Sequence, residues 1–250
     1  MERPIFSLII LLACCSSSLA QQPASLHPGD TYKKVCFGII GSIDYCNRWL
    51  TDVDKTEFSE NYIRLFNDSE IGKPGYTIGA SLEVPLNRKS ILTTGLLLAN
   101  KGYQTKWRDA QWPDPSLPPS SFKSIYNIYY LDIPLVVNTF LDPSISKWFL
   151  HYGFTGNIFL QQNDTFIFEE NGKKDKNTHK ANEDYKPINL STEIGFGRQF
   201  SLSPTMNLQI APVFQYGIFS IIDAPVGNHL WSIGLNIVCY WQKSSPNELE

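Results

Sequence analysis

Apolar and polar residues alternate along the chain in about eight segments between residues 34 and 242. In the clearest segment, one parity carries Trp231, Ile233, Leu235, Ile237, Cys239 and Trp241, whereas the other parity is mostly polar or small. Alternate residues of a strand point to the same side, so this segment predicts a strand with one apolar face. Its length from 231 to 242 exceeds the five or six residues of an average soluble strand and approaches the roughly 9–11 that cross a bilayer at a tilt.

The spacing of these segments predicts the topology. The predicted strands are 34–45, 75–86, 90–103, 122–140, 147–162, 187–200, 205–218 and 231–242. The connections between them are alternately long and short, which is typical of outer-membrane barrels with long extracellular loops and short periplasmic turns. The chain is therefore predicted to be all-β, an antiparallel up-and-down transmembrane β-barrel of about eight strands, with ten as the alternative.

The polar faces indicate which side of each strand points inward. They are rich in Gly, Ser, Thr, Asn and Gln and poor in Lys and Glu, unlike a solvated surface. Small neutral side chains suit the crowded interior of a narrow barrel, so we expect the apolar faces to meet lipid. The alternative is a soluble or lipid-anchored ligand-binding β-barrel with the opposite facing.

Aromatic residues concentrate near the strand ends, as in the interfacial belts of membrane barrels. They are Tyr76, Tyr103, Tyr129, Trp148, Phe200, Tyr216, Trp231 and Trp241. In a soluble β fold the same residues would belong to the core.

The first twenty residues resemble a secretory signal peptide. Arg3 precedes an apolar stretch from Ile5 to Ala13, and Ser18-Leu19-Ala20 fits a cleavage site before Gln21. Nine apolar residues are too few for a helix across about 30 Å of hydrocarbon. A second route stays open, because the sequence up to Cys14 resembles a lipoprotein processing site.

The predicted organisation has four parts. They are a signal peptide at 1–20, a short segment at 21–33, an outer-membrane β-barrel at 34–243 and a tail at 244–250. The predicted location is the outer membrane.

The composition argues against a nucleic-acid partner, a disulfide framework and a metal or cofactor site. The net charge is −3 and no polybasic run occurs, so nucleic acid is not an expected partner. Cleavage after Ala20 would leave Cys36, Cys46 and Cys239, an odd number that cannot form a closed disulfide framework. The four histidines are scattered, so neither a metal site nor a cofactor is expected.

Several motifs resemble the PorT-like outer-membrane β-barrel proteins common in Bacteroidetes. They are Tyr129-Tyr130-Leu131-Asp132-Ile133-Pro134-Leu135, Lys101-Gly102-Tyr103, Gly195-Phe196-Gly197, Ala211-Pro212-Val213-Phe214-Gln215-Tyr216 and Trp231-Ser232-Ile233-Gly234-Leu235. The resemblance covers roughly 35–241 and implies a barrel of eight or ten strands without an assigned reaction. One branch of that family is associated with protein secretion. The chain departs from the usual ending, because 244–250 follows the last aromatic residue.

Besides Asp44, four charged residues fall on the predicted inner faces: Glu83, Lys101, Asp132 and Glu193. Buried charges persist when they are paired or hydrogen-bonded, so a structural polar network is expected inside the barrel. The functional alternatives are an ion or proton path and a pair of catalytic carboxylates.

A membrane-embedded hydrolase is a further alternative. His151 faces inward, and Ser220, Asp223 and His229 lie close together in sequence. A Ser-His-Asp triad is recognised by geometry, however, and neither Gly-x-Ser-x-Gly nor His-Glu-x-x-His occurs. We therefore expect no enzyme and no catalytic residues.

The long connections are the remaining candidates for function, because loops on a rigid scaffold carry recognition. Trp49 lies in the first, and Trp107 and Trp112 lie in the second. Exposed tryptophans favour a protein or glycan partner; alternatively they only pack the loops. The expected protein is a monomer in membrane lipid.

Overall fold

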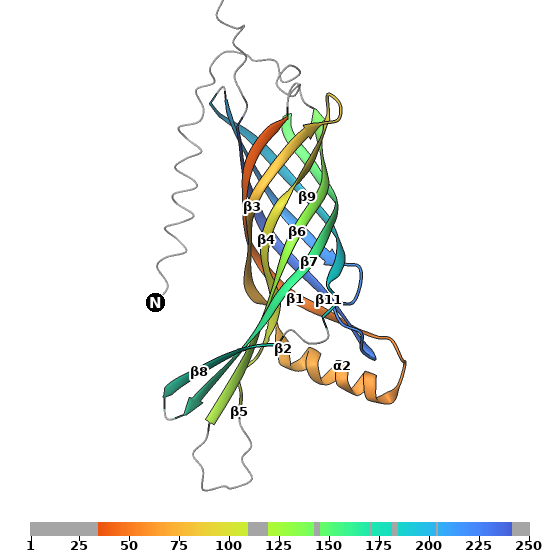
Figure 1. Ribbon diagram of the computed structural model, residues 1–250, viewed down its shortest axis with the longest axis vertical. Coiled ribbons are helices and arrows are strands. Elements are labelled where there is room, and N and C mark those ends of the chain that lie inside the picture. Colours follow the sequence, from red (N-terminus) through yellow and green to blue (C-terminus); the bar gives the residue numbers. More distant parts are fainter. Residues whose placement is uncertain are drawn as a thin grey trace, which may run out of the picture.

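The computed structural model describes residues 35–109, 120–142, 146–170, 172–181, 185–203 and 205–241. Eight antiparallel strands close into a barrel in the order β1-β3-β4-β6-β7-β9-β10-β11, with β11 returning to β1 (Figure 1). Their bounds are β1 Cys36–Asp52, β3 Lys73–Pro85, β4 Ser90–Thr105, β6 Ser120–Asp142, β7 Ser146–Glu170, β9 Ile188–Ser203, β10 Met206–Gly217 and β11 Val226–Trp241. The predicted fold class is confirmed. The predicted signal peptide, Cys14 and the tail lie outside the described residues.

Side chains in the wall alternate as the sequence predicts. In β1, Ile39 and Ile43 are 56 % and 78 % exposed, whereas Ser42 and Asp44, which have the opposite parity, are buried inside. The same arrangement, with apolar side chains outside and polar side chains inside, recurs in β11, where Ile233 is exposed and Ser232 is buried. A soluble barrel would bury its apolar faces, so this facing favours contact with lipid over the soluble alternative.

Aromatic residues lie at both ends of the apolar wall. Near the short turns, the Trp148 and Phe196 rings stack with centroids 5.0 Å apart, and the Arg198 guanidinium lies 5.3 Å from the Trp148 centroid. Near the long connections, the rings of Tyr45 and Trp231 lie 6.2 Å apart. Such positions suit the two interfaces of a membrane, where rings meet both hydrocarbon and headgroups.

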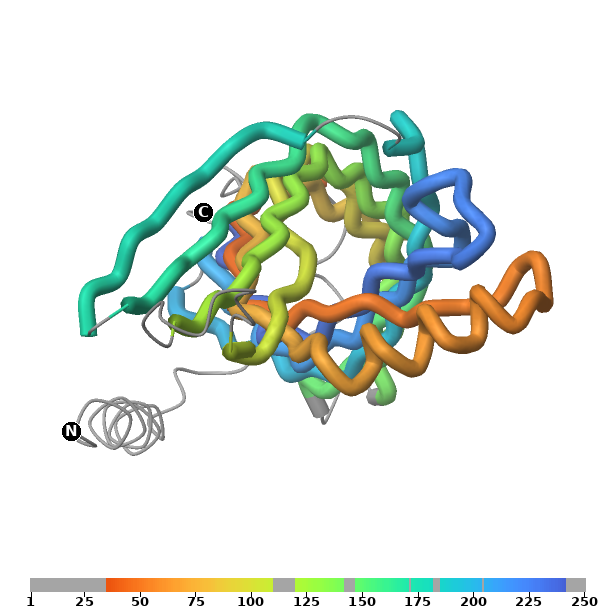
Figure 2. The backbone as a smooth tube through the Cα atoms, turned by 90° about the horizontal axis from the view of Figure 1, so that it is seen from below, coloured from red at the N-terminus to blue at the C-terminus, as the bar shows by residue number. Residues whose placement is uncertain are grey.

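The long connections, predicted as loops, contain regular structure. They hold α2 (Glu57–Ser69) and the short strands β2 (Glu70–Ile71), β5 (Arg108–Asp109) and β8 (Lys173–Lys180). β6 and β7 continue beyond the ring and, with β5 and β8, form a sheet that projects from the barrel; we call β5, the far ends of β6 and β7, and β8 the projecting sheet (Figures 1 and 2). α2 lies at the same end, on the other side of the mouth (Figure 2).

Helix α2 begins at a capping threonine. The Thr56 Oγ1 accepts a hydrogen bond from the Ser59 backbone N–H at 3.2 Å, and Glu57 and Glu60 lie in the first turn. Both features stabilise a helix N-terminus. Aromatic residues four apart follow, with the rings of Tyr62 and Phe66 stacked at 4.2 Å. Among the described residues, no helix is long and apolar enough to cross a membrane.

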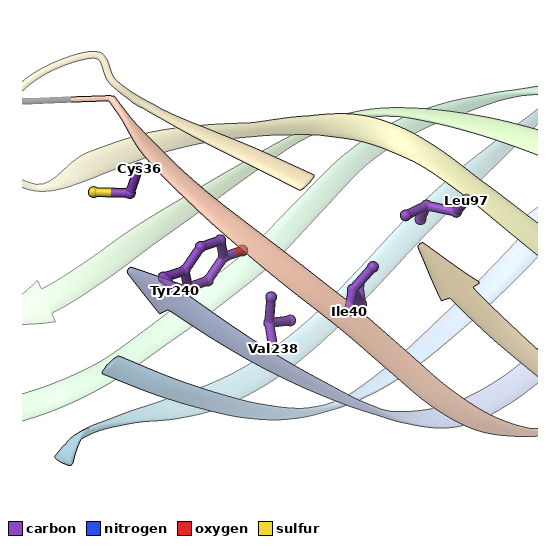
Figure 3. Packing of buried hydrophobic residues seen from close by; sticks show 5 residues of the cluster. All are labelled: Cys36, Ile40, Leu97, Val238 and Tyr240. Atoms are coloured by element: carbon purple, nitrogen blue, oxygen red, sulfur yellow. The ribbon is translucent and has the colours of Figure 1, made fainter. Parts of the chain in front are cut away.

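The interior is apolar toward both ends and polar between them. The end with the short turns contains Cys36, Ile40, Leu97, Val238 and Tyr240 as one cluster (Figure 3). A second cluster there includes Phe140 and Phe149. Within the described residues, no disulfide joins Cys36, Cys46 and Cys239.

Candidate functional site

A buried ion pair lies on the polar level of the interior. The Lys101 Nζ lies 2.8 Å from the Asp132 Oδ2, and both side chains are less than a tenth exposed. The Asn157 Nδ2 donates to the other Asp132 oxygen at 2.7 Å. The carboxylate therefore has a partner on each oxygen, as a charge removed from water requires.

The second carboxylate on this level is Glu193. Its Oε1 accepts hydrogen bonds from the Thr155 hydroxyl and, at 2.9 Å, from the Gln215 Nε2. Its Oε2 lies 3.2 Å from the His151 Nε2. Neutral donors and one imidazole thus surround Glu193, whereas the ammonium group of the network bonds to Asp132.

Amide and hydroxyl side chains join the two carboxylates. The Ser191 Oγ donates to the Asn157 Oδ1 at 2.9 Å and accepts from the Gln215 Nε2 at 2.9 Å. Because Asn157 bonds to Asp132 and Gln215 bonds to Glu193, the hydrogen-bonded chain is continuous between the two acids.

The chain continues toward the short turns and ends at Glu83. The His151 Nδ1 lies 2.8 Å from the Asn138 Oδ1, and Asn138 donates to Gln209 at 3.3 Å. The Gln209 Nε2 in turn donates to Glu83 Oε1 at 2.8 Å. The structure thus places all four predicted charged residues inside the barrel, although only Lys101 and Asp132 form an ion pair with each other.

The space left between these side chains is small. A cavity of about 50 Å³ is lined by Asp44, Asp132, His151 and Glu193, among others. That volume holds a few water molecules at most, given the roughly 10–15 Å³ of such volume that one water needs. The interior therefore resembles a wet core rather than an aqueous channel.

The mouth on the side of the long connections is closed by an apolar cluster. Ile128, Tyr130, Tyr103 and Leu230 are buried there with Ile221, which reaches in from the connection between β10 and β11. The outer part of this cluster includes Tyr185, whose ring stacks on Phe159 at 4.9 Å. Burial raises the pKa of Tyr185 to about 12, as expected for a phenol removed from water.

A second ion pair attaches the α2 segment to this mouth. The Arg48 guanidinium donates from Nε and Nη2 to the two Glu70 oxygens at 2.8 Å and 2.5 Å. It also donates to Asn228 at 2.7 Å and lies 4.0 Å from the Tyr103 ring centroid. Arginine suits this position because its guanidinium can bond to both carboxylate oxygens and also stack on an aromatic ring. Residues of β2, β4 and β11 thus meet on the Arg48 side chain.

The predicted loop tryptophans do not form one site. Trp49 is exposed and pairs across the strands with His229. Trp107 is also exposed, and the Lys174 Nζ of β8 lies 5.2 Å from its ring centroid. Trp112 lies outside the described residues. Of the two described tryptophans, Trp107 is the one that contacts the projecting sheet.

The residues of the alternative hydrolase do not assemble. The Ser220 Oγ donates to the Ile222 carbonyl at 2.7 Å, and the His229 Nδ1 lies 3.0 Å from the Gly217 carbonyl. Asp223 is exposed and pairs with Lys186 at 2.7 Å, whereas His151 lies in the interior network. Within the described ranges, no group of three His, Cys, Asp or Glu residues could hold a metal ion.

Sequence reasoning missed Arg48, Glu70 and the buried Lys73, which donates to Asn100 at 2.7 Å. All three lie beyond the ends given to the strands 34–45 and 75–86. The sequence did contain a signal for Arg48. The alternation continues at Cys46, Arg48 and Leu50, and residues of one parity on a strand point to the same side.

Comparisons with known proteins agree with this architecture. A family described as outer membrane protein beta-barrel domain matches residues 30–223. A search of curated proteins finds no match.

The chain is similar to the solved structure of Ail, the attachment invasion locus protein of Yersinia pestis, at 13 % sequence identity. The match covers 82 % of this chain and 97 % of that chain, with a TM-score of 0.28. Neisserial surface protein A is 10 % identical, with 81 % and 95 % covered and a TM-score of 0.30. The match over 30–223 spans most of the chain. The protein therefore belongs to the outer membrane protein beta-barrel domain family.

Proposed function

We propose that this protein is a closed outer-membrane barrel that acts as a binding platform through its projecting sheet. One observation carries the proposal: β6 and β7 have 23 and 25 residues, about twice the roughly 9–11 that cross a bilayer. The additional residues support a separate sheet with β5 and β8. A protein whose only role was a filled transmembrane wall would not need them.

The location is part of the proposal. The predicted signal peptide at 1–20 would export the chain, and the short turns would face the periplasm, so the projecting sheet would lie outside the cell. The resemblance of 129–135 to PorT-like proteins extends the proposal to a partner within a protein-secretion apparatus. The partner is then a protein, and the barrel is a monomer.

Protease treatment of intact cells tests the orientation of the platform. Trypsin should cut β8 at Lys173, Lys174 or Lys176 from outside, because all three side chains are exposed. The remaining barrel should stay protected until the outer membrane is permeabilised. Cleavage of β8 that requires permeabilisation would place the sheet in the periplasm and overturn the proposal.

Purified protein in a planar bilayer should show no steady conductance. The reason is the filled interior, since about eight strands enclose only enough space for side chains whereas general porins use 16–18 strands. The control is a general porin inserted under the same conditions. Large and stable channels at a dilution that gives single insertions would make transport the leading function.

A further inference from the structure

β8 is an edge strand. It pairs with β7 from Lys173 opposite Glu170 to Lys180 opposite Asn163, and all eight of its residues are exposed. On the side away from β7, no strand of the described ranges pairs with it. An open edge of eight residues is about 26 Å long and offers unpaired backbone N–H and C=O groups.

The composition of this edge is basic. Its sequence, KKDKNTHK, contains four lysines and one aspartate. Lysines on an edge strand oppose indiscriminate strand pairing. They oppose a second copy of this chain in particular, because two β8 strands side by side would bring lysines close to lysines. The same charges favour a strand that carries carboxylates.

Alternation places most of this charge on one face. Lys174, Lys176 and Lys180 share a parity, with Trp107 next to Lys174. The only acidic side chain opposite them on β7 is Glu169, 3.4 Å from Lys174; Ile167 and Asn163 lie opposite the other two lysines. Both groups of the Lys174–Glu169 pair are well exposed, so it contributes little and leaves the face positive.

We propose that β8 binds an extended acidic peptide segment of another protein as the next strand of the projecting sheet. The backbone edge would supply the hydrogen-bond ladder, and Lys174, Lys176 and Lys180 would select carboxylates at every second position. This inference rests on the proposed role as a binding platform and names its partner. An open backbone edge favours a peptide, because a polyanion without a peptide backbone could use the lysines but not the ladder.

The test uses the full chain refolded in lipid nanodiscs and a fluorescent ten-residue peptide of alternating Thr and Glu. Binding is measured by fluorescence anisotropy. We expect saturable binding and at least a tenfold loss of affinity when every Glu is replaced by Lys. Alternate backbone amides of the peptide can be N-methylated in two registers without a change of charge. We expect a similar loss of affinity in the one register that removes the donors facing β8, and no such loss in the other.

The variant K174E/K176E/K180E should reverse the preference toward the Lys peptide. Its matched control, R88E/K89E/K147E, makes the same charge change near the short turns, where these side chains are also exposed. The control should bind the acidic peptide as the native chain does. Heat-shifted gel mobility reports whether each variant folds.

Four results would overturn the inference: no binding of the acidic peptide, equal binding of both N-methylated forms, displacement of the peptide by inorganic polyphosphate of equal charge at equal concentration, or dimerisation through β8. Each leaves the protease experiment unaffected. If trypsin cuts β8 from outside the cell but the peptide-binding tests fail, the proposed binding platform stands and only the acidic peptide is rejected as its partner.

Discussion

Replacing Asp132 with alanine should destabilise the barrel by about 3–5 kcal/mol, the cost of removing one partner of a buried ion pair. The Lys101 ammonium would remain in the interior without its carboxylate, and the Asn157 amide would lose its acceptor. Urea unfolding in lipid vesicles, followed by tryptophan fluorescence, measures the free energy of unfolding.

The matched control removes both charges. In K101M/D132L, two apolar side chains of similar size replace the pair, and the free energy of unfolding should return to within about 1–2 kcal/mol of the native value, since such replacements are often neutral or stabilising. A D132A variant as stable as the native barrel would mean that water reaches Lys101 freely. The interior would then be an open path.

Replacing Ile233 with arginine should destabilise the barrel in vesicles, because a cation on the lipid face costs roughly 2–4 kcal/mol at the midplane and less toward the interfaces. Ile233 is 51 % exposed on the outer wall. Leu235 has the same facing and lies further from Tyr45 and Trp231, so arginine there should have the larger effect. At the inward Ser232 or Asn236 the response should follow side-chain volume rather than lipid polarity.

Phe58 provides the control for this substitution. It is 70 % exposed on α2, beyond the barrel wall. Phe58→Arg should therefore change the free energy of unfolding by less than about 0.5 kcal/mol, as is usual for surface positions. Equal effects at Phe58 and Ile233, or equal tolerance of arginine at 232, 233, 235 and 236, would contradict the assigned facing.

The membrane-spanning wall could be predicted from sequence because each strand separates two unlike environments. Lipid on one side and a packed interior on the other impose a period of two that few residues violate. All eight strands of the ring and the facing of Ile233 and Ser232 follow from this period.

Outside the membrane that constraint is absent, and the predictions there were incomplete. β8 is a strand although KKDKNTHK has neither alternation nor β-branched residues other than one threonine, because the continued edge of β7 supplies its pairing. α2 was treated as loop, although Phe58, Tyr62 and Phe66 recur at the helical spacing.

The interior pairing needed information that spacing does not contain. Sequence reasoning placed Lys101 and Asp132 on inner faces, but the register sets Lys101 opposite Ile128 and Asp132 opposite Leu97. The ion pair therefore forms diagonally, between residues that are offset by four positions in the β4–β6 ladder. Such a contact depends on strand register and tilt together.

The long course of β6 and β7 has a mechanical consequence. These strands remain paired from Phe140 opposite Phe149, near the short turns, to Ser120 opposite Glu170, at the far end of the projecting sheet, with one register shift between Tyr129 and Tyr130. A load applied to β8 would therefore pass as shear through the paired β6 and β7 into the membrane-embedded wall, and the register shift is the place along this path where the two strands would bend first. Each two-residue lengthening of both strands would move a molecule held by β8 outward by about 7 Å along the strand direction.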